Sequence, residues 1–273
     1  FLGEIPYYVS RKNRPTLEQR IRFWKKPKEV CQIVVKAGKR NIVNEAFRVL
    51  RTNFEFTIGT HPEQNVIVFT SLNQGSGKSH LAANMAMSLA IKKKKVLLID
   101  GDLRHGSTSM LVGSPGEGLS DYLNGRIADI HDILHKGEES GLVKYFDVIP
   151  IGTIPPNPTE LLFTPLLEQM IRQMRQEYDY VFIDCPPIEV VADTPIYEQF
   201  ADRTIFVVRA GLMERSMLPE IDALYKEKKF KNMTLILNAT KARGGRYGSH
   251  YGYGYGYGYG YNYNKEKSGG AKS

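Results

Sequence analysis

A glycine-containing loop followed by a lysine and a serine has the residue types of a phosphate-binding site. Residues 71–77 (SLNQGSG) follow the apolar run VIVFT and precede Lys78, Ser79 and a segment with helical apolar spacing. In a strand–loop–helix unit, backbone N–H groups converge at the helix N-terminus, where the helix dipole favours an anion. Lys78 would reach the β- and γ-phosphates of a nucleotide, and Ser79 would bind Mg²⁺. We predict a nucleotide site formed by Gln74, Gly75, Ser76, Gly77, Lys78, Ser79 and His80.

The loop departs from the usual pattern at one position. In G-x-x-x-x-G-K-[ST] the first glycine would fall at Leu72. The stretch GSGKS alone could be an ordinary loop, and the strand before it and helix after it favour the nucleotide site.

Three carboxylates follow two other apolar runs. Asp100 and Asp102 follow the run at 96–99, and Asp184 follows the run at 180–183. Ligands of parallel sheets bind at the carboxyl ends of the strands, so we expect these carboxylates beside the phosphate loop. Mg²⁺ needs oxygen ligands, and a carboxylate near the γ-phosphate can accept a proton from an attacking hydroxyl. Each aspartate alone could instead cap a helix.

Apolar runs that alternate with helical patterns predict an α/β fold, in which a parallel sheet carries helices on both faces. The strands are expected at 31–35, 66–70, 96–99, 146–151, 180–183, 204–208 and 233–238. The helices are expected at 41–58, 80–90, 165–177, 194–201 and 217–227, with two short helices within 119–134 and a helix start at Thr159.

The charge of the chain is concentrated at its N-terminus. Residues 1–40 hold eleven Lys/Arg and three Glu, whereas residues 41–273 hold 26 of each sign. This segment could lie near anionic lipid, bind nucleic acid, or be an ordinary solvated stretch.

The chain opens without an initiator methionine, so we expect a fragment of a longer protein. Cys31 and Cys185 lack disulfide spacing, and no apolar run approaches the 18 residues of a membrane span.

The C-terminal stretch has a different composition. Tyr and Gly alternate from Tyr251 to Tyr261, which leaves no aliphatic side chains for a core, so we expect a disordered tail. Lys and Arg are absent from 247–264, which counts against stacking on nucleic acid, and we expect no nucleic-acid partner. The chain therefore divides into a basic segment at 1–40, a P-loop domain at 41–243 and a tyrosine-rich tail at 244–273.

Together these motifs resemble those of the bacterial tyrosine kinases that govern capsule and exopolysaccharide export. That family has a P-loop fold related to the partition and cell-division-site ATPases. It usually has Pro and an acidic or small residue where this chain has Gln74 and Ser76. The other matching motifs are LLIDGDLR at 97–104, VFIDCPP at 181–187, PPNPTELL at 155–162, Glu45-x-x-Arg48-x-x-Arg51 and the tyrosine-rich end.

The resemblance implies an ATP- and Mg²⁺-dependent protein-tyrosine autokinase. Ser79 and Asp102 would hold Mg²⁺, with Asp184 acting through water. Asp100 would be the base that activates a tyrosine hydroxyl, and Arg104 would support the phosphate site. Tyr122 falls where some members carry a regulatory tyrosine, but we favour the interpretation that it packs on a short helix. The implied acceptors are Tyr247, Tyr251, Tyr253, Tyr255, Tyr257, Tyr259, Tyr261 and Tyr263.

The resemblance also implies partners and a location. Glu45, Arg48 and Arg51 would join copies in a ring, within which each tail reaches a neighbouring site. A two-span membrane activator, fused or separate, and a cognate phosphatase would be further partners. The chain would be a soluble cytoplasmic fragment working at the cytoplasmic face of the bacterial inner membrane.

Two alternatives remain open. A partition-type or division-site ATPase shares the fold, but that family has an early lysine in K-G-G-x-G-K, where this chain has Asn73-Gln74. A nucleotide-gated assembly module would bind ATP without catalysis. The eukaryotic kinase signatures H-R-D, D-F-G and G-x-G-x-x-G are missing, so a kinase here would use a P-loop scaffold.

Overall fold

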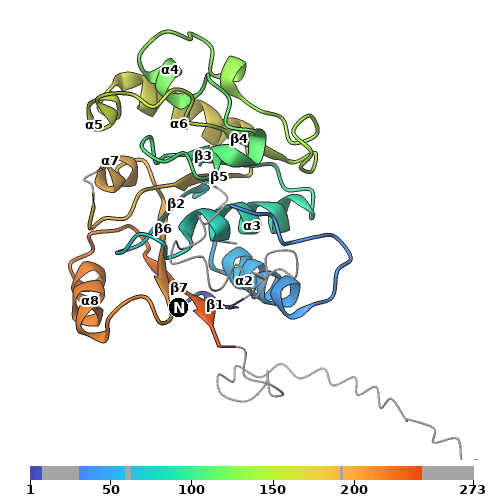
Figure 1. The fold of residues 1–273 in the computed structure, drawn as a ribbon, viewed down its shortest axis with the longest axis vertical. Helices are drawn as coiled ribbons and strands as arrows, with labels where there is room; N and C mark the ends of the chain where they lie inside the picture. Colours follow the sequence, from blue (N-terminus) through green and yellow to red (C-terminus); the bar gives the residue numbers. More distant parts are fainter. Residues whose placement is uncertain (8–30, 59–62, 191–192, 242–273) are drawn as a thin grey trace, which may run out of the picture. The chain divides into compact units, whose positions relative to one another are not determined.

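The computed structural model describes residues 1–7, 31–58, 63–190 and 193–241. Its centre is a seven-stranded sheet in the order β1-β7-β6-β2-β5-β3-β4, in which every pair of neighbours is parallel (Figure 1). The strands are β1 (Gly3–Pro6), β2 (Val66–Thr70), β3 (Val96–Asp100), β4 (Phe146–Ile149), β5 (Tyr180–Asp184), β6 (Arg203–Arg209) and β7 (Thr234–Thr240). The α/β parallel-sheet prediction is confirmed.

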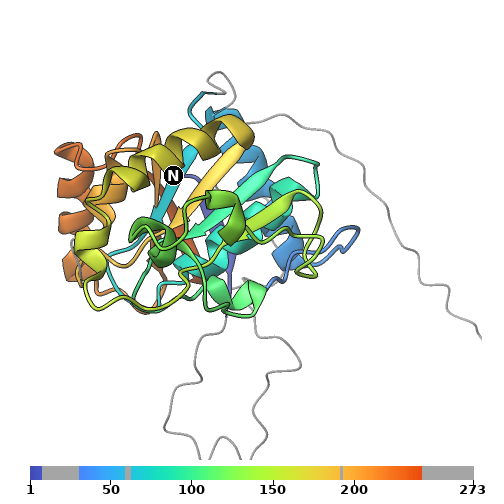
Figure 2. The same cartoon turned by 90° about the horizontal axis from the view of Figure 1, so that it is seen from above.

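The helices cover both faces of this sheet. They are α2 (Ile42–Ile58), α3 (Lys78–Ala90), α4 (Leu119–Leu123), α5 (Pro158–Leu161), α6 (Pro165–Glu177), α7 (Thr194–Glu198) and α8 (Leu218–Lys226). Short 3₁₀ helices occur at Ser109–Val112, Ile130–Ile133 and Arg215–Met217. Figure 2 looks onto the side that α4, α5 and α6 cover.

The alternating direction of side chains along each strand divides the core into two layers. On β2, Ile67 and Phe69 pack with α2 and α3, whereas Val66 and Val68 pack with α4, α6 and α7. All five β2 residues are buried, which explains the unbroken β-branched and aromatic run. A third, smaller cluster lies under α8 and includes Phe206 and Ile221.

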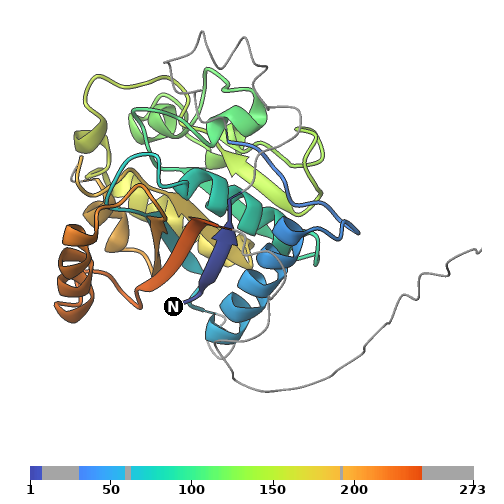
Figure 3. The ribbon, with the colours of Figure 1, turned by 60° about the horizontal axis from the view of Figure 1, so that its bottom comes forward.

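The N-terminal strand was not predicted from the sequence. Gly3–Pro6 pairs with β7 at the sheet edge, beside α2 (Figure 3). Residues that we assigned to the basic segment therefore contribute to the sheet. Phe1–Lys241 form one compact unit.

The predicted strand at 31–35 is wrong. These residues have no regular structure, because buried asparagine side chains take the place of a neighbouring strand. Asn84 Oδ1 on α3 accepts hydrogen bonds from Val34 N and Val35 N at 2.7 and 3.1 Å. Asn44 Oδ1 on α2 accepts one from Lys36 N at 2.8 Å.

The structure bears on the second short helix expected within 119–134 and does not describe the predicted tail. The second short helix expected within 119–134 is a 3₁₀ turn at Ile130–Ile133. The tail at 244–273 and its tyrosines lie outside the described residues.

Across the parts of the chain that the structure describes, no helix is both long and apolar enough to span a bilayer.

Candidate nucleotide-binding site

The phosphate loop runs from the end of β2 to the first turn of α3, as predicted. Gly77 precedes Lys78 with φ 90°, a backbone conformation that glycine adopts at little cost. A Cβ at this position would overlap Asn238 Nδ2. Asn238, on β7, donates from Nδ2 to Ser76 O at 2.9 Å. A side chain at 77 would therefore have to displace Asn238 from its hydrogen bond to Ser76.

The absent first glycine has a packing explanation. Leu72 occupies that position, is 2% exposed, and joins the small cluster under α8 with Phe206 and Ile221. Arg209, at the end of β6, donates to Gly75 O at 2.5 Å, and Ser76 Oγ donates to Asn73 O at 2.8 Å. The loop is thus held by side chains and by an apolar anchor.

The segment after β5 lies against the start of the phosphate loop. Ile188 N donates to Ser71 O at 2.9 Å, and Asn73 Nδ2 donates to Glu189 Oε2 at 2.8 Å. Thr70 Oγ1 donates to Pro186 O at 2.9 Å. Asn73, where partition-type ATPases would have a lysine, is therefore bonded to the segment that follows the D-x-P-P motif.

The carboxylates that end β3 and β5 converge beside the loop. Asp100 and Asp184 are partners in the β3–β5 register, and Phe69 of β2 pairs with Asp184. Burial raises the pKa of Asp184 to about 8; the charge of Asp100 adds to this, while nearby Lys78 and Ser79 oppose it. Asp184, Lys78 and Ser79 are therefore neighbours, as the sequence indicated.

Asp100 and Asp102 differ in environment. Asp100 is fully buried, and its Oδ2 accepts hydrogen bonds from Ser109 N and Oγ, both at 2.7 Å. Burial raises the pKa of Asp100 to about 6, against the opposing effect of these hydrogen bonds. The side chain of Asp102 is 13% exposed, and His105 Nδ1 lies 3.2 Å from each of its oxygens. Asp102, not Asp100, faces the accessible rim.

The donor set fits a cation together with a phosphate ligand. Nine buried side-chain polar atoms in the described residues lack a hydrogen-bond partner, and six belong to Asp100, Arg104, Thr108, Asp184 and Tyr197 around this edge. Both carboxylate oxygens of Asp184 are among them. A buried unpaired carboxylate is costly unless a cation or a proton neutralises it. In the described part of the chain, no three His, Cys, Asp or Glu side chains form a metal-binding group, so a cation here would also need Ser79, water or phosphate oxygens.

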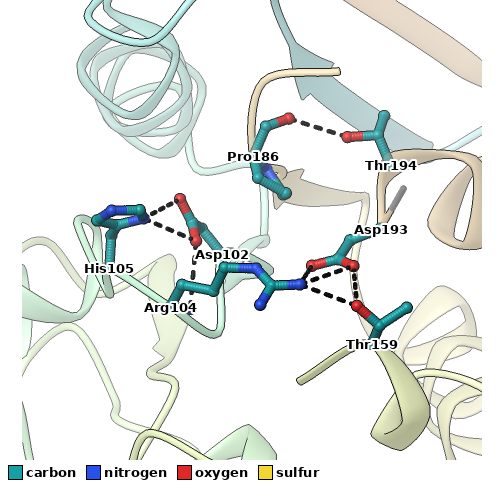
Figure 4. A network of polar contacts seen from close by, with 7 residues as sticks. All are labelled: Asp102, Arg104, His105, Thr159, Pro186, Asp193 and Thr194. Carbon is teal, nitrogen blue, oxygen red and sulfur yellow. Dashed lines mark hydrogen bonds and ion pairs between the residues drawn. The ribbon is translucent and has the colours of Figure 1, made fainter. Parts of the chain in front are cut away.

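Arg104 belongs to a network that sequence reasoning missed (Figure 4). Its Nη2 donates to Thr159 Oγ1 at 2.9 Å and lies 3.4 Å from both carboxylate oxygens of Asp193. Thr159 Oγ1 donates to Asp193 Oδ1 at 2.7 Å. The neighbouring Thr194 Oγ1 donates to Pro186 O at 2.9 Å. The sequence marked Thr159 only as a helix start and as part of PPNPTELL, and no spacing pattern marked Asp193.

The three α2 residues that the sequence predicts to join copies, Glu45, Arg48 and Arg51, differ in exposure. Glu45 and Arg48 form an exposed pair at 2.6 Å, with side chains 52% and 38% exposed. Arg51 is 13% exposed, and its Nη1 donates to Ser88 O at 2.8 Å on α3. Arg51 is therefore bonded within the chain, and the predicted role of the three residues in joining copies stays a prediction. Tyr122 is 3% exposed and packs in the α4–α6 layer, so it has the position of a packing residue.

A glycine loop between β2 and α3, with acidic strand ends beside it, defines the class of P-loop nucleotide-binding domains. A family model described as an AAA domain matches residues 64–212. The chain is 34% identical over 208 residues to tyrosine-protein kinase CpsD of Streptococcus agalactiae, covering 76% of this chain and 87% of that protein. It is 36% identical over 184 residues to tyrosine-protein kinase wzc of Salmonella typhimurium, covering 65% of this chain.

Solved structures agree with these relatives. The kinase domain of Escherichia coli tyrosine kinase ETK superposes with a TM-score of 0.74 at 27% identity, covering 93% of this chain and 94% of that one. The septum site-determining protein MinD of Pyrococcus horikoshii, solved with Mg-ADP, has a TM-score of 0.52 at 23% identity and shows the fold alone. The chain belongs to the bacterial tyrosine-protein kinase family. It spans about a quarter of the length of the larger relatives, 24% in the case of wzc.

Proposed function

We propose that this chain is an ATP- and Mg²⁺-dependent protein-tyrosine kinase that phosphorylates the tail tyrosines of neighbouring copies. Its activity would regulate the synthesis and export of capsule or exopolysaccharide. The observation that carries the proposal is the buried carboxylate of Asp184 beside Lys78 and Ser79. The tail is the proposed acceptor because eight of the sixteen tyrosines of the chain follow residue 246.

The residues have separate proposed roles in phosphoryl transfer. Lys78 would bind the β- and γ-phosphates, and Ser79 and Asp102 would hold the cation, with Asp184 acting through water. When bound, Mg²⁺ neutralises the charge that develops on the phosphate oxygens. Arg104 supports the phosphate side of the site, held in place by Asp193.

Asp100 is the proposed proton acceptor, and Asp102 could take this role only in place of binding the cation. The raised pKa of Asp100, about 6, suits a base near neutral pH. However, Asp100 has no exposed surface, and Ser109 is hydrogen-bonded to it. A tyrosine hydroxyl could therefore contact Asp100 only if the segment that contains Ser109 moved. Asp102 needs no such movement.

The family relationship supports further proposals about assembly, partners and location. We propose a ring of copies that uses Glu45, Arg48 and Arg51, a two-span membrane activator that is fused or separate, and a cognate phosphatase. The location would be the cytoplasmic face of the bacterial inner membrane.

The test is incubation of the chain with ATP and Mg²⁺, followed by detection of phosphotyrosine and mapping by mass spectrometry. We expect phosphate on tail tyrosines, and its loss in Lys78→Met. Absence of phosphotyrosine in the parent, or an undiminished signal in Lys78→Met, would overturn the proposal. ATP hydrolysis without phosphotyrosine would indicate a partition-type ATPase instead.

A further inference from the structure

Two neighbouring strands each carry, near the carboxyl end, a side chain that reaches the phosphate loop. Arg209 is the last residue of β6, and its register partner on β7 is Asn238. Arg209 Nη1 donates to Gly75 O at 2.5 Å, and Asn238 Nδ2 donates to Ser76 O at 2.9 Å. A cross-strand pair therefore holds two consecutive carbonyl groups of the loop from the same side.

The direction of these carbonyl groups fixes the direction of the amides that follow them. A trans peptide points its C=O and its N–H to opposite sides. Because Gly75 O and Ser76 O face β6 and β7, the N–H groups of Ser76 and Gly77 face away from those strands. In the sheet, β6 and β7 lie on one side of β2, whereas β5 and β3 lie on the other (Figure 1). The acidic strand ends, Asp184 and Asp100, are on that other side.

The amide of Asn238 is held in one orientation by the residue that follows it. Ala239 N donates to Asn238 Oδ1 at 2.8 Å, so Nδ2 is the atom directed at Ser76 O. Ala239 has φ 57°, a left-handed conformation that residues other than glycine rarely adopt. The pairing of β7 with β1 skips this residue. Backbone strain of this kind persists where the surroundings enforce it, and it is common at functional sites.

We propose that Arg209 and Asn238 are positioning residues, which orient the amides of Ser76 and Gly77 to bind the phosphates of the nucleotide. This role rests on the proposed function, since it concerns the same nucleotide site. Neither side chain touches the reacting atoms, and each acts through the loop carbonyl that it holds. Phosphate binding therefore depends on β6 and β7 as well as on the loop and the N-terminus of α3.

The proposed role concerns the phosphates and not the rest of the nucleotide. Oriented amides donate to phosphate oxygens, so loss of either positioning residue should weaken the binding of pyrophosphate and ADP. The binding of adenosine should not change. Hydrogen bonds to a charged group are about twice as strong as those between neutral groups. We therefore expect an amide turned out of place to reduce phosphate affinity about tenfold or more.

The first experiment measures dissociation constants of pyrophosphate, ADP and adenosine for the full chain with Mg²⁺, by calorimetry. Asn238→Ala removes the Nδ2 donor, so pyrophosphate and ADP should bind about tenfold or more weakly, and adenosine as to the parent. Asn65→Ala is the matched control, because Asn65 is also buried and its Nδ2 donates to two backbone carbonyls. Asn65 precedes β2, at the opposite end of the strand from the loop, so this variant should keep the parent's affinities. Equal pyrophosphate affinity in the two variants, or an equal loss for adenosine, would overturn the proposal.

The second experiment tests Arg209 with the same ligands. Arg209→Met keeps an unbranched apolar stem and removes the donor to Gly75 O, and we expect pyrophosphate to bind about tenfold or more weakly. The loss should persist in about 1 M salt, where charges are screened beyond about 3 Å. A loss that disappears at high salt would mean that Arg209 attracts the anion by charge alone, and would overturn its positioning role.

Neither experiment requires phosphoryl transfer. A parent chain that binds pyrophosphate and ADP but forms no phosphotyrosine would overturn the proposed kinase activity, and the variants would still decide the positioning role. A parent chain that binds neither ligand would overturn both proposals.

Discussion

The guanidinium of Arg104 lies 3.4 Å from both carboxylate oxygens of Asp193, a residue 89 positions further along the chain. Asp193 has no exposed surface, whereas the Arg104 side chain is about one third exposed. Thr159 bonds to both, so the pair joins the segments after β3, before α6 and after β5. All three segments border the nucleotide edge of the sheet.

Removal of Asp193 should destabilise this part of the fold. Asp193→Ala leaves Arg104 and Thr159 without their shared acceptor, and we expect a loss of about 1–3 kcal/mol in the free energy of unfolding. Thr159→Val removes one hydroxyl and should cost less. Urea denaturation with matched m-values measures both. An Asp193→Ala variant as stable as the parent would show that the network contributes nothing.

The two arginines of the α2 motif should respond differently to mutation. Arg51→Ala loses the hydrogen bonds to Ser88 and should cost about 1–3 kcal/mol of stability. Arg48→Ala breaks an exposed pair and should change stability by about 0.5 kcal/mol or less. Light scattering then separates assembly from folding: we expect Arg48→Ala to reduce the oligomer mass while the subunit stays folded. Equal losses of stability in the two variants would refute this division.

The phosphate loop should not tolerate a side chain at Gly77. Gly77 and Gly113 both have positive φ, 90° and 81°, and each alanine variant should cost about 1–2 kcal/mol from the backbone alone. Gly113 has open space around it among the described residues, whereas a Cβ at 77 meets Asn238. We therefore expect Gly77→Ala to lose nucleotide binding as well, measured with a fluorescent ATP analogue. Retained binding in Gly77→Ala would mean that the loop can move away from β7.

The choice between Asp100 and Asp102 can be decided by amide substitution. Because Asp102 is accessible, we expect Asp102→Asn to lower phosphotyrosine formation about 100-fold or more. Asp100→Asn keeps an acceptor for Ser109 and should have a smaller effect. Because Asp102 is also a proposed cation ligand, nucleotide and Mg²⁺ affinities are measured in parallel, and lost phosphotyrosine with both affinities unchanged indicates lost proton transfer. A larger defect in Asp100→Asn would assign the proton transfer to Asp100.

Glu198 should make stability depend on pH. Burial raises the pKa of Glu198, and hydrogen bonds from Thr204 and from Lys231 N offset part of that rise. The native state therefore keeps this proton to a higher pH than the unfolded chain, so stability falls as pH rises through the raised pKa. Glu198→Gln should lose this decrease, and its stability relative to the parent should increase from pH 4 to pH 8. Urea titrations at both pH values measure the difference, in which the effects of Asp100 and Asp184 cancel.

The core strands and the acidic cluster were determined by the sequence alone. Each of these strands is a short apolar run, and parallel strands end at a common edge, so Asp100 and Asp184 had to meet beside Lys78. These inferences need only the local composition of each run and the rule that parallel strands end at a common edge of the sheet. The spacing of the motifs is therefore sufficient to locate the site.

The remaining features were decided by tertiary contacts. Leu72 replaces a glycine because α8 offers it an apolar partner, and Arg51 turns inward because Ser88 lies on the adjacent helix. The residues at 31–35 bond to Asn84 instead of a strand, and Asp193 meets Arg104 from 89 positions away. Spacing along the chain carries no information about such pairs, because hydrogen bonds and packing are satisfied by whichever group the fold brings near.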